Sequence, residues 1–329
     1  MALDLKSFAS KTKHVRGSLE QKLFSRLGLL AVVLSLFCFF ITSCSKEQKE
    51  QSGAILSRKT MLPVNQVVTP AGLQVELPGM RPQVLALSPD SSLLITSGKT
   101  HELVAVDPAT GQILQRVPLP PEPTNEAQPR APSENVLKAD ENGQVSYTGL
   151  AFSPDGKRIY LSNVMGSLKV FSVDPYATIS ALCSFPLPLA DAPRRKEEIP
   201  AGICLSPDGK SLYVALNLSN RLSELDAASG RLIRIFDVGV APYDVVLVGK
   251  KLYVSNWGGR RPKPGDTTGP AGQGMLVKVD PLTYISAEGS VSVIDLESSQ
   301  VSDILVHLHP SALAVSPDRR YIVCANAAS

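Results

Sequence analysis

The stretch SPDGKRIYLSN, residues 153–163, occurs four times with small changes in this chain of 329 residues. The other copies read SPDSSLLITSG at 88–98, SPDGKSLYVALN at 206–217 and SPDRRYIVCAN at 316–326. In each copy a turn is followed by a run of aliphatic, β-branched and aromatic residues, which is typical of a strand. Such recurrence indicates a structural unit that is built several times.

The repeated unit contains four strand-like runs. One precedes the SPD turn, as in GLAFSPDG, and one follows it. A third run ends in aspartate, and a fourth follows a turn such as DPATG or DAASG. A further unit without SPD begins at YDVVLVGKKLYVSN, residues 243–256. Four strands in a unit of about 40 residues predict a blade of a β-propeller, so we expect an all-β fold with about four and a half four-stranded blades.

The recurring polar residues have a structural explanation. In SPDG, proline presets the backbone, aspartate bonds the turn amides, and glycine takes the position that needs positive φ. Asparagine ends the second run, where it tolerates the left-handed conformation and closes a turn. We therefore assign structural roles to Asn163, Asn256 and Asn326, and to Asp107, Asp174, Asp226 and Asp295 at the ends of the third runs.

The motifs SPDGK with IYLSN or LYVSN resemble the YVTN-type β-propeller repeat, found in bacterial surface proteins and lactonase-like seven-bladed propellers. The resemblance covers about residues 62–329. The long unit YVSNWGGRRPKPGD…EGSVSVIDL is similar to a subgroup in which a metal-dependent phosphoesterase domain follows the propeller. The resemblance implies a ring of seven blades, of which the C-terminal part is expected to be missing here. Residues 62–78 read as strand material that would complete the last blade of a closed ring.

The N-terminus carries an export-type pattern. A basic leader precedes the apolar run LGLLAVVLSLFCFFI at 27–41, which is shorter than the about 20 residues of a membrane span. The following ITSC resembles a bacterial lipobox that ends at Cys44. We expect a lipoprotein-type signal segment at 1–44, a linker at 45–61 and the propeller at 62–329. Lipidation of Cys44, followed by serine, implies an extracytoplasmic protein on the bacterial outer membrane, facing the periplasm or the cell surface; an uncleaved anchor is the alternative.

Residues that do not repeat are better candidates for function. Prolines mark the start of several first runs, beside the central channel of the predicted ring, and the residues around them differ from unit to unit. Tyr147 also falls close to this rim. The candidate ligand-binding residues are Arg81, Tyr243, Trp257, Arg260, Arg261 and His309. An arginine cluster there is suited to a small anionic ligand, and the loop-bearing face is suited to a protein partner.

Several kinds of chemistry have no support in the residues. The chain has four histidines and a net charge of +3, much of it before residue 50, so we expect no metal site and no nucleic-acid partner. No motif for a haem, a nucleotide or a serine hydrolase is present, and we expect no cofactor. The leading interpretation is a membrane-anchored binding or scaffold module, without an assigned catalytic residue. The alternatives are a lactonase-like hydrolase with its site at the channel mouth, and a propeller remnant of a phosphoesterase fusion protein.

Overall fold

Every element of secondary structure in the described part of the protein is a β-strand. The computed structural model describes residues 60–61, 67–68, 72–122 and 139–328. Its 22 strands form four four-stranded antiparallel sheets and three two-stranded pairs. The predicted signal segment at 1–44, with Cys44, and nearly all of the predicted linker at 45–61 lie outside the described residues. The described strands confirm the all-β class.

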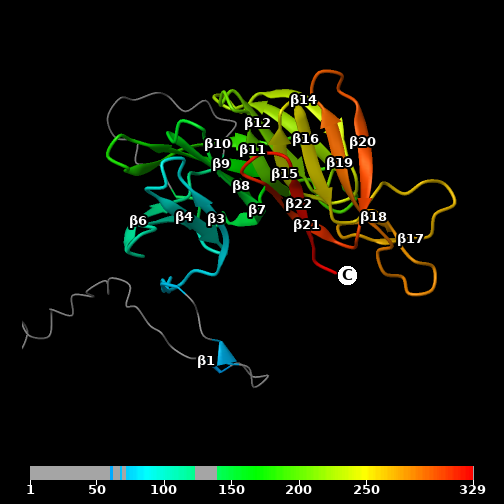
Figure 1. Ribbon diagram of the computed structural model, residues 1–329, viewed down its shortest axis with the longest axis horizontal. Helices are drawn as coiled ribbons and strands as arrows, with labels where there is room; N and C mark the ends of the chain where they lie inside the picture. The colour runs from blue at the N-terminus through cyan, green and yellow to red at the C-terminus, as the bar shows by residue number, and fades with distance from the viewer. Residues whose placement is uncertain (1–59, 62–66, 69–71, 123–138, 329) are drawn as a thin grey trace, which may run out of the picture. The chain divides into compact units, whose positions relative to one another are not determined.

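The four-stranded sheets follow one another along the chain, and we call them blades 1 to 4 (Figure 1). Blade 1 contains β3 (Pro82–Leu87), β4 (Leu94–Gly98), β5 (Glu102–Val106) and β6 (Ile113–Pro118). Blade 2 contains β7 (Val145–Phe152), β8 (Arg158–Asn163), β9 (Ser167–Val173) and β10 (Ile179–Pro186). Blade 3 contains β11 (Pro200–Leu205), β12 (Ser211–Leu216), β13 (Arg221–Asp226) and β14 (Leu232–Asp237). Blade 4 contains β15 (Pro242–Val248), β16 (Lys251–Asn256), β19 (Gly289–Asp295) and β20 (Val301–Val306).

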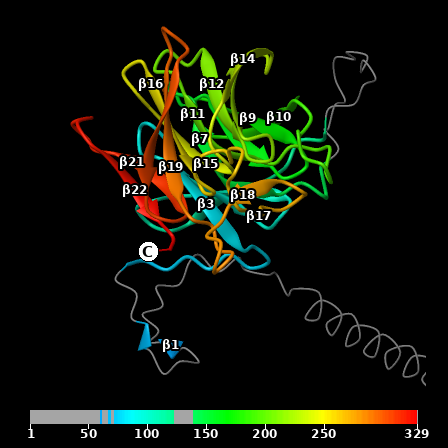
Figure 2. The same ribbon diagram turned by 90° about the vertical axis from the view of Figure 1, so that its right-hand side faces the viewer.

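A two-stranded sheet, the half-blade, follows blade 4. It consists of β21 (Pro310–Val315) and β22 (Ile322–Asn326) and corresponds to the first two strands of the other blades. Figure 2 shows the half-blade (red) beside β19 of blade 4 (orange). The inner strands β3, β7, β11, β15 and β21 lie beside one another in this order. This is the arrangement of a β-propeller, and it confirms the predicted four and a half blades.

The core lies between the blades. Alternate residues of a strand point to opposite faces of its sheet. In β8, Ile159 and Leu161 pack with blade 1, whereas Tyr160 packs with blade 3. A third cluster joins blade 3 to blade 4 around Phe236 and Leu252. Blades 2 and 3 are therefore buried on both faces, which explains why their repeated runs are almost continuously apolar.

The SPD turns are built as predicted. The residue after the aspartate has positive φ in all four copies: Gly156 and Gly209, but also Ser91 and Arg319. The aspartate accepts a hydrogen bond of 2.6 Å from the serine hydroxyl in each copy, and one of 3.1 Å from the amide two residues on. The third-run aspartates likewise cap the following turns, for example Asp107 with the amide of Ala109 at 2.8 Å.

The asparagines close a turn as predicted, since the Asn163 carbonyl accepts a hydrogen bond of 3.0 Å from the Gly166 amide, but the predicted left-handed conformation was wrong. Asn163 and Asn256 are fully buried, and neither has positive φ. Their amides bond across to the next strand instead, Asn163 to Ser167 at 3.0 Å and Asn256 to Ser292 at 2.8 Å. They are structural residues, but they join strands and do not supply a left-handed turn.

Of the predicted strand material at 62–78, the structure describes residues 67–68, which form a short strand, and residues 72–78, which form none. Leu73 and Val75 lie against Gly111 of blade 1, and the expected completion of a last blade stays a prediction. Upstream, β1 (Thr60–Met61) pairs with β2 (Val67–Val68). Residues 258–289 form an insertion between β16 and β19 of blade 4, and it contains a hairpin of β17 (Thr268–Pro270) and β18 (Leu276–Lys278).

Candidate functional site

The inner strands begin at one end of their blades, and we call this end the inner rim. The register shifts just after the start of these strands, for example between Pro200 and Ile203. The shift is widest in β7, between Val145 and Leu150, which face Asn163 and Leu161 of β8. Bulges of this kind re-aim side chains and are common next to functional sites.

Tyr147 lies in the wide bulge of β7 and has a φ of 51°. Two more non-glycine residues at the starts of inner strands have positive φ, Ala241 at 54° and His309 at 56°. A bulky residue in this conformation is strained, and such strain is concentrated at functional sites. The inner rim is therefore one of the strained parts of the scaffold.

Two aromatic pairs occupy this rim. The rings of Tyr147 and Tyr243 lie 5.3 Å apart at 49°, and the Thr148 hydroxyl donates to the Tyr243 carbonyl at 3.2 Å. Blades 2 and 4 thus contact each other directly, past blade 3. The rings of Trp257 and His309 are stacked, 3.8 Å apart at 7°. The Tyr147 side chain is 40% exposed and Trp257 is 38% exposed, so both pairs present aromatic surface to solvent.

The tyrosines of the first pair are neutral phenols. Burial raises the pKa of Tyr147, and the nearby Tyr243 adds to this effect, whereas Arg195 opposes it. Burial and the Asp244 carboxylate raise the pKa of Tyr243. At neutral pH both hydroxyl groups carry their protons and can act as hydrogen-bond donors.

The predicted arginine pair is engaged within the protein. Arg260 forms a two-pronged ion pair with Asp266, at 2.8 and 3.0 Å, and a third contact with Glu288 at 3.1 Å. Arg261 donates to the Val238 carbonyl at 2.8 Å and to Asp237 at 2.9 Å. These charges hold the 258–289 insertion in place and are already neutralised.

Arg81 is exposed at the start of β3, where its carbonyl accepts a hydrogen bond of 3.2 Å from the amide of Lys99. Within the described residues its guanidinium has no hydrogen bond or ion pair. Of the six predicted site residues, the structure brings Trp257 and His309 into direct contact and places Tyr243 against Tyr147.

Two carboxylates near the inner rim, the buried Glu198 and the partly buried Asp244, were not predicted. Glu198 accepts hydrogen bonds from the amides of Ile199 and Leu218, both at 2.8 Å, and from the Ser219 hydroxyl. Burial raises its pKa against the effect of these donors. Asp244 joins β15 to the half-blade, because its Oδ2 accepts from the amide of Leu313 at 2.8 Å, and burial raises its pKa also. Both carboxylates bond backbone amides, so they lock the rim in shape.

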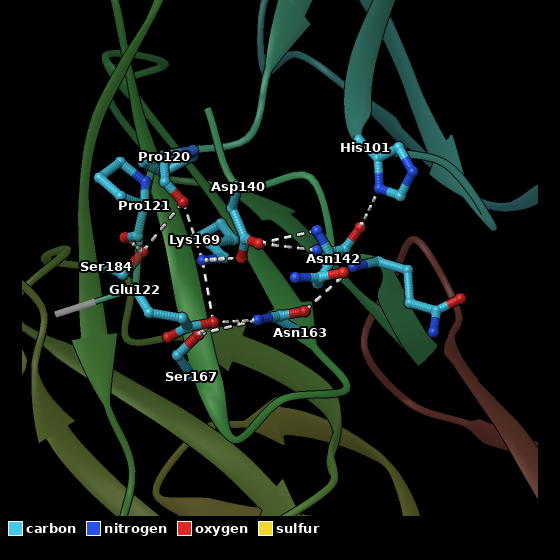
Figure 3. A network of polar contacts seen from close by, with 12 residues as sticks. His101, Pro120, Pro121, Glu122, Asp140, Asn142, Asn163, Ser167, Lys169 and Ser184 are labelled. Carbon is cyan, nitrogen blue, oxygen red and sulfur yellow. Dashed lines mark hydrogen bonds and ion pairs between the residues drawn. The ribbon is translucent and has the colours of Figure 1, made fainter. Parts of the chain in front are cut away.

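A larger polar network lies beside the start of blade 2 (Figure 3). The ammonium group of Lys169 is fully buried in β9 and contacts Asp140 at 2.7 Å, Glu122 at 3.0 Å and the Pro120 carbonyl at 2.8 Å. Burial raises the pKa of Asp140, but the contact with Lys169 and two backbone amides outweigh this and lower it overall. The sequence signal was a lysine inside the apolar run SLKVFSV.

The network joins three parts of the chain. Glu122 also accepts hydrogen bonds from Asn163 at 2.5 Å and from Ser167 at 3.0 Å (Figure 3). His101, between β4 and β5, lies 3.2 Å from the Gly143 carbonyl. Lys169 therefore clamps the two described ends of the insertion between blades 1 and 2. Within the described residues, no three His, Cys, Asp or Glu side chains are grouped to hold a metal ion.

Comparisons with known proteins support the fold. No family model and no curated protein sequence matches the chain. Among solved structures, hydrazine synthase of Kuenenia stuttgartiensis is similar with a TM-score of 0.50 and 22% identity, over 78% of this chain and 58% of that one.

Two further structures are also similar, but with lower scores. U3-55K has a TM-score of 0.47 and 11% identity, over 73% of this chain and 57% of that one. The RRP9 WD40 repeats have a TM-score of 0.48 and 12% identity, over 73% of this chain and 56% of that one. The chain thus spans less than two thirds of each of these structures. At such identities the likeness to hydrazine synthase is one of fold alone: this chain is a β-propeller repeat protein.

Proposed function

We propose that this chain is an extracytoplasmic YVTN-type propeller, held at a bacterial outer membrane by a lipid on Cys44, whose inner rim binds a small anionic ligand or a protein partner. The observation that supports it best is the pair of aromatic contacts, Tyr147 with Tyr243 and Trp257 with His309, on a strained and partly exposed rim. Aromatic rings with polar edges are typical anchors of binding surfaces.

The surrounding polar groups support binding more than covalent chemistry. Glu198 and Asp244 each accept hydrogen bonds from backbone amides, and Arg260 is saturated by carboxylates. A general acid or base must instead reach a substrate within hydrogen-bond distance. Of the three predicted arginines, the exposed Arg81 is the one that suits an anionic ligand.

Rim binding can be tested with two probes. Trp257 is the only tryptophan of the chain, so its emission reports on the rim. We expect gluconate, a small anionic probe, to change this emission in the wild type and not in Arg81→Ala.

For a protein partner, a benzophenone amino acid at Tyr243 should give a discrete cross-linked product in intact cells. The same group at the exposed Tyr176 of blade 2 is the control. No emission change, together with equal cross-linking at both positions, would refute rim binding.

The anchor has its own test. Within the described residues, no helix is long and apolar enough to cross a bilayer. We expect Cys44→Ala to release the protein from membranes into the soluble fraction. Unchanged membrane retention would support an uncleaved apolar segment instead of lipidation.

A further inference from the structure

The tip of the 258–289 insertion exposes three large apolar side chains. Leu282 is 90% exposed, Tyr284 70% and Ile285 56%. They lie in the stretch PLTYI, residues 281–285, which contains no charged side chain. We call this stretch the apolar tip. Large apolar side chains grouped on a surface mark sites of interaction.

The apolar tip is supported by buried side chains and by ion pairs. Val277 and Val279 alternate into a small core with Val240, and Val279 is bridged to Ser286 on the other side of the tip. Arg260 and Lys278 meet at Glu288, which pins the base of the insertion. The base of the tip is thus packed and ion-paired. Val277 and Val279 in this base are buried, whereas the large apolar side chains of the tip are exposed.

The tip repeats the aspartate-capped turn of the blades. Asp280 accepts hydrogen bonds of 2.9 Å from the amides of Leu282 and Thr283, as Asp107 does from Ala109 in blade 1. The fourth residue after the aspartate donates its amide to the aspartate carbonyl, at 2.8 Å in Gly111 and 2.9 Å in Tyr284.

That fourth position is left-handed, with a φ of 72° at Gly111, 73° at Gly230, 59° at Ser299 and 56° at Tyr284. Glycine is the residue that adopts this conformation without strain. A bulky tyrosine there is strained, and residual strain of this kind points to a function of the side chain. The strain and the exposure are independent observations on the same residue.

We propose that the apolar tip inserts into the interfacial region of the lipid bilayer to which the protein is anchored. This inference rests on the membrane anchoring proposed above. Leucine and isoleucine favour the acyl boundary, and tyrosine places an apolar ring below and a hydroxyl at the headgroups. A convex, uncharged tip on a rigid support suits a lipid surface, and it would fix the orientation of the propeller relative to the membrane.

The test places a fluorophore on the full chain in vesicles of phosphatidylethanolamine and phosphatidylglycerol. A thiol-reactive label goes on Thr283→Cys, and the matched control is Tyr176→Cys. Tyr176 is 89% exposed in the Asp174-capped turn of blade 2. The chain without an added cysteine gives the background from Cys183, Cys204 and Cys324. We expect nitroxide lipids to quench the label at 283 and not at 176, and aqueous iodide to do the reverse.

A second variant separates docking from folding. Tyr284→Gly removes the strain, so we expect a higher melting temperature, together with loss of lipid quenching at position 283. Partitioning of the tip should weaken about tenfold or more, the scale of one buried large side chain. If Tyr284 had only a structural role, Tyr284→Gly would leave the lipid quenching at position 283 unchanged.

Three outcomes would overturn the inference. Equal iodide quenching at 283 and 176 would leave the tip in water. Protection from iodide without quenching by nitroxide lipids would assign the tip to a protein surface, such as a second copy of this chain. Unchanged lipid quenching in Tyr284→Gly would contradict the role of the strained tyrosine, on which the inference rests. Release of the chain by Cys44→Ala is measured separately, so failure of the tip does not imply failure of the lipid anchor.

Discussion

The indole of Trp257 and the imidazole of His309 are stacked face to face, with centroids 3.8 Å apart and planes inclined by 7°. Trp257 follows β16 and His309 precedes β21, so the stack joins blade 4 to the half-blade. His309 also holds a φ of 56°, which keeps its ring in this place. One face of the only tryptophan is therefore covered by a ring from the next sheet.

The stack makes a direct spectroscopic prediction. His309→Ala uncovers the indole face, so we expect a red-shifted emission maximum and stronger quenching by iodide. The free energy of unfolding should fall by about 0.5–1.5 kcal/mol, the worth of an aromatic pair. The control is His307→Ala, an exposed histidine two residues away, which should leave the emission unchanged. Equal spectra for the two variants would contradict the stacked arrangement.

Close packing of the inner strands predicts a strong effect of one methyl group. A Cβ on Gly202 would lie 2.6 Å from the Cα of Asp244 and 2.9 Å from the Tyr243 carbonyl oxygen, both on the backbone of blade 4. We expect Gly202→Ala to lower the free energy of unfolding in urea by about 1–3 kcal/mol because the backbone must move. Gly72→Ala, with no atom within 4 Å of its Cβ, is the control. A neutral Gly202→Ala would show that blades 3 and 4 are packed more loosely.

The Lys169 clamp predicts a large loss on removal of one charge. Lys169→Met leaves the nearly buried Asp140 carboxylate without its cation, so we expect a loss of about 3–5 kcal/mol in urea unfolding. Adding Asp140→Asn should restore part of the lost free energy of unfolding, because the unpaired charge is then absent. Lys210→Met, which breaks an exposed pair with Asp208, should cost less than about 1 kcal/mol. A small effect of Lys169→Met would contradict the clamp.

The SPD turns predict a loss of stability in acid. The Ser88 hydroxyl and the Ser92 amide and hydroxyl lower the pKa of Asp90 from 3.8 to about 2. The corresponding serines lower the pKa of Asp155, Asp208 and Asp318 in the same way. A carboxyl group with a lower pKa in the folded state binds fewer protons there than in the unfolded state. Its contribution to stability is complete above pH 3.8 and is lost as the pH falls through the folded pKa.

We therefore expect the melting temperature to fall between pH 4 and about pH 2. Asp90→Asn should flatten this dependence, because the residue no longer titrates. Glu198 and Asp244, whose pKa values are raised by burial, act in the opposite direction and lose their contribution as the pH rises. A melting temperature that rises on acidification through this range would contradict the role of the turns.

The fold was predictable because its determinants are local and repeat. A turn such as Ser153 to Gly156 contains its own hydrogen bonds and its own left-handed position, so the sequence reveals it without knowledge of distant residues. Ser91 and Arg319 take that position without being glycine, because the serine–aspartate contact holds the turn. The same locality explains why the aspartate-capped turns were recognised.

The site was predictable only in part because its contacts are distant in sequence. Trp257, Tyr243 and His309 were singled out as candidates because they do not repeat. The engagement of Arg260 by Glu288, 28 positions later, and the clamp of Lys169 on Asp140 depend on chain paths that no local pattern encodes. The bulge at Tyr147 left one signal, since Tyr147 stands six residues before Ser153, where other units have proline.

The clamp in blade 2 also has a use in protein engineering. Glu122 and Asp140 are both fixed to Lys169, so the span between them starts and ends at anchored points. Doubling the length of a loop with fixed ends costs only about 0.6 kcal/mol of closure entropy. An affinity tag or a small reporter domain spliced between Glu122 and Asp140 should therefore cost the blades little stability, because Lys169 holds both residues. The position is a ready-made handle for immobilising or labelling the propeller while its rim and its apolar tip keep their native sequence.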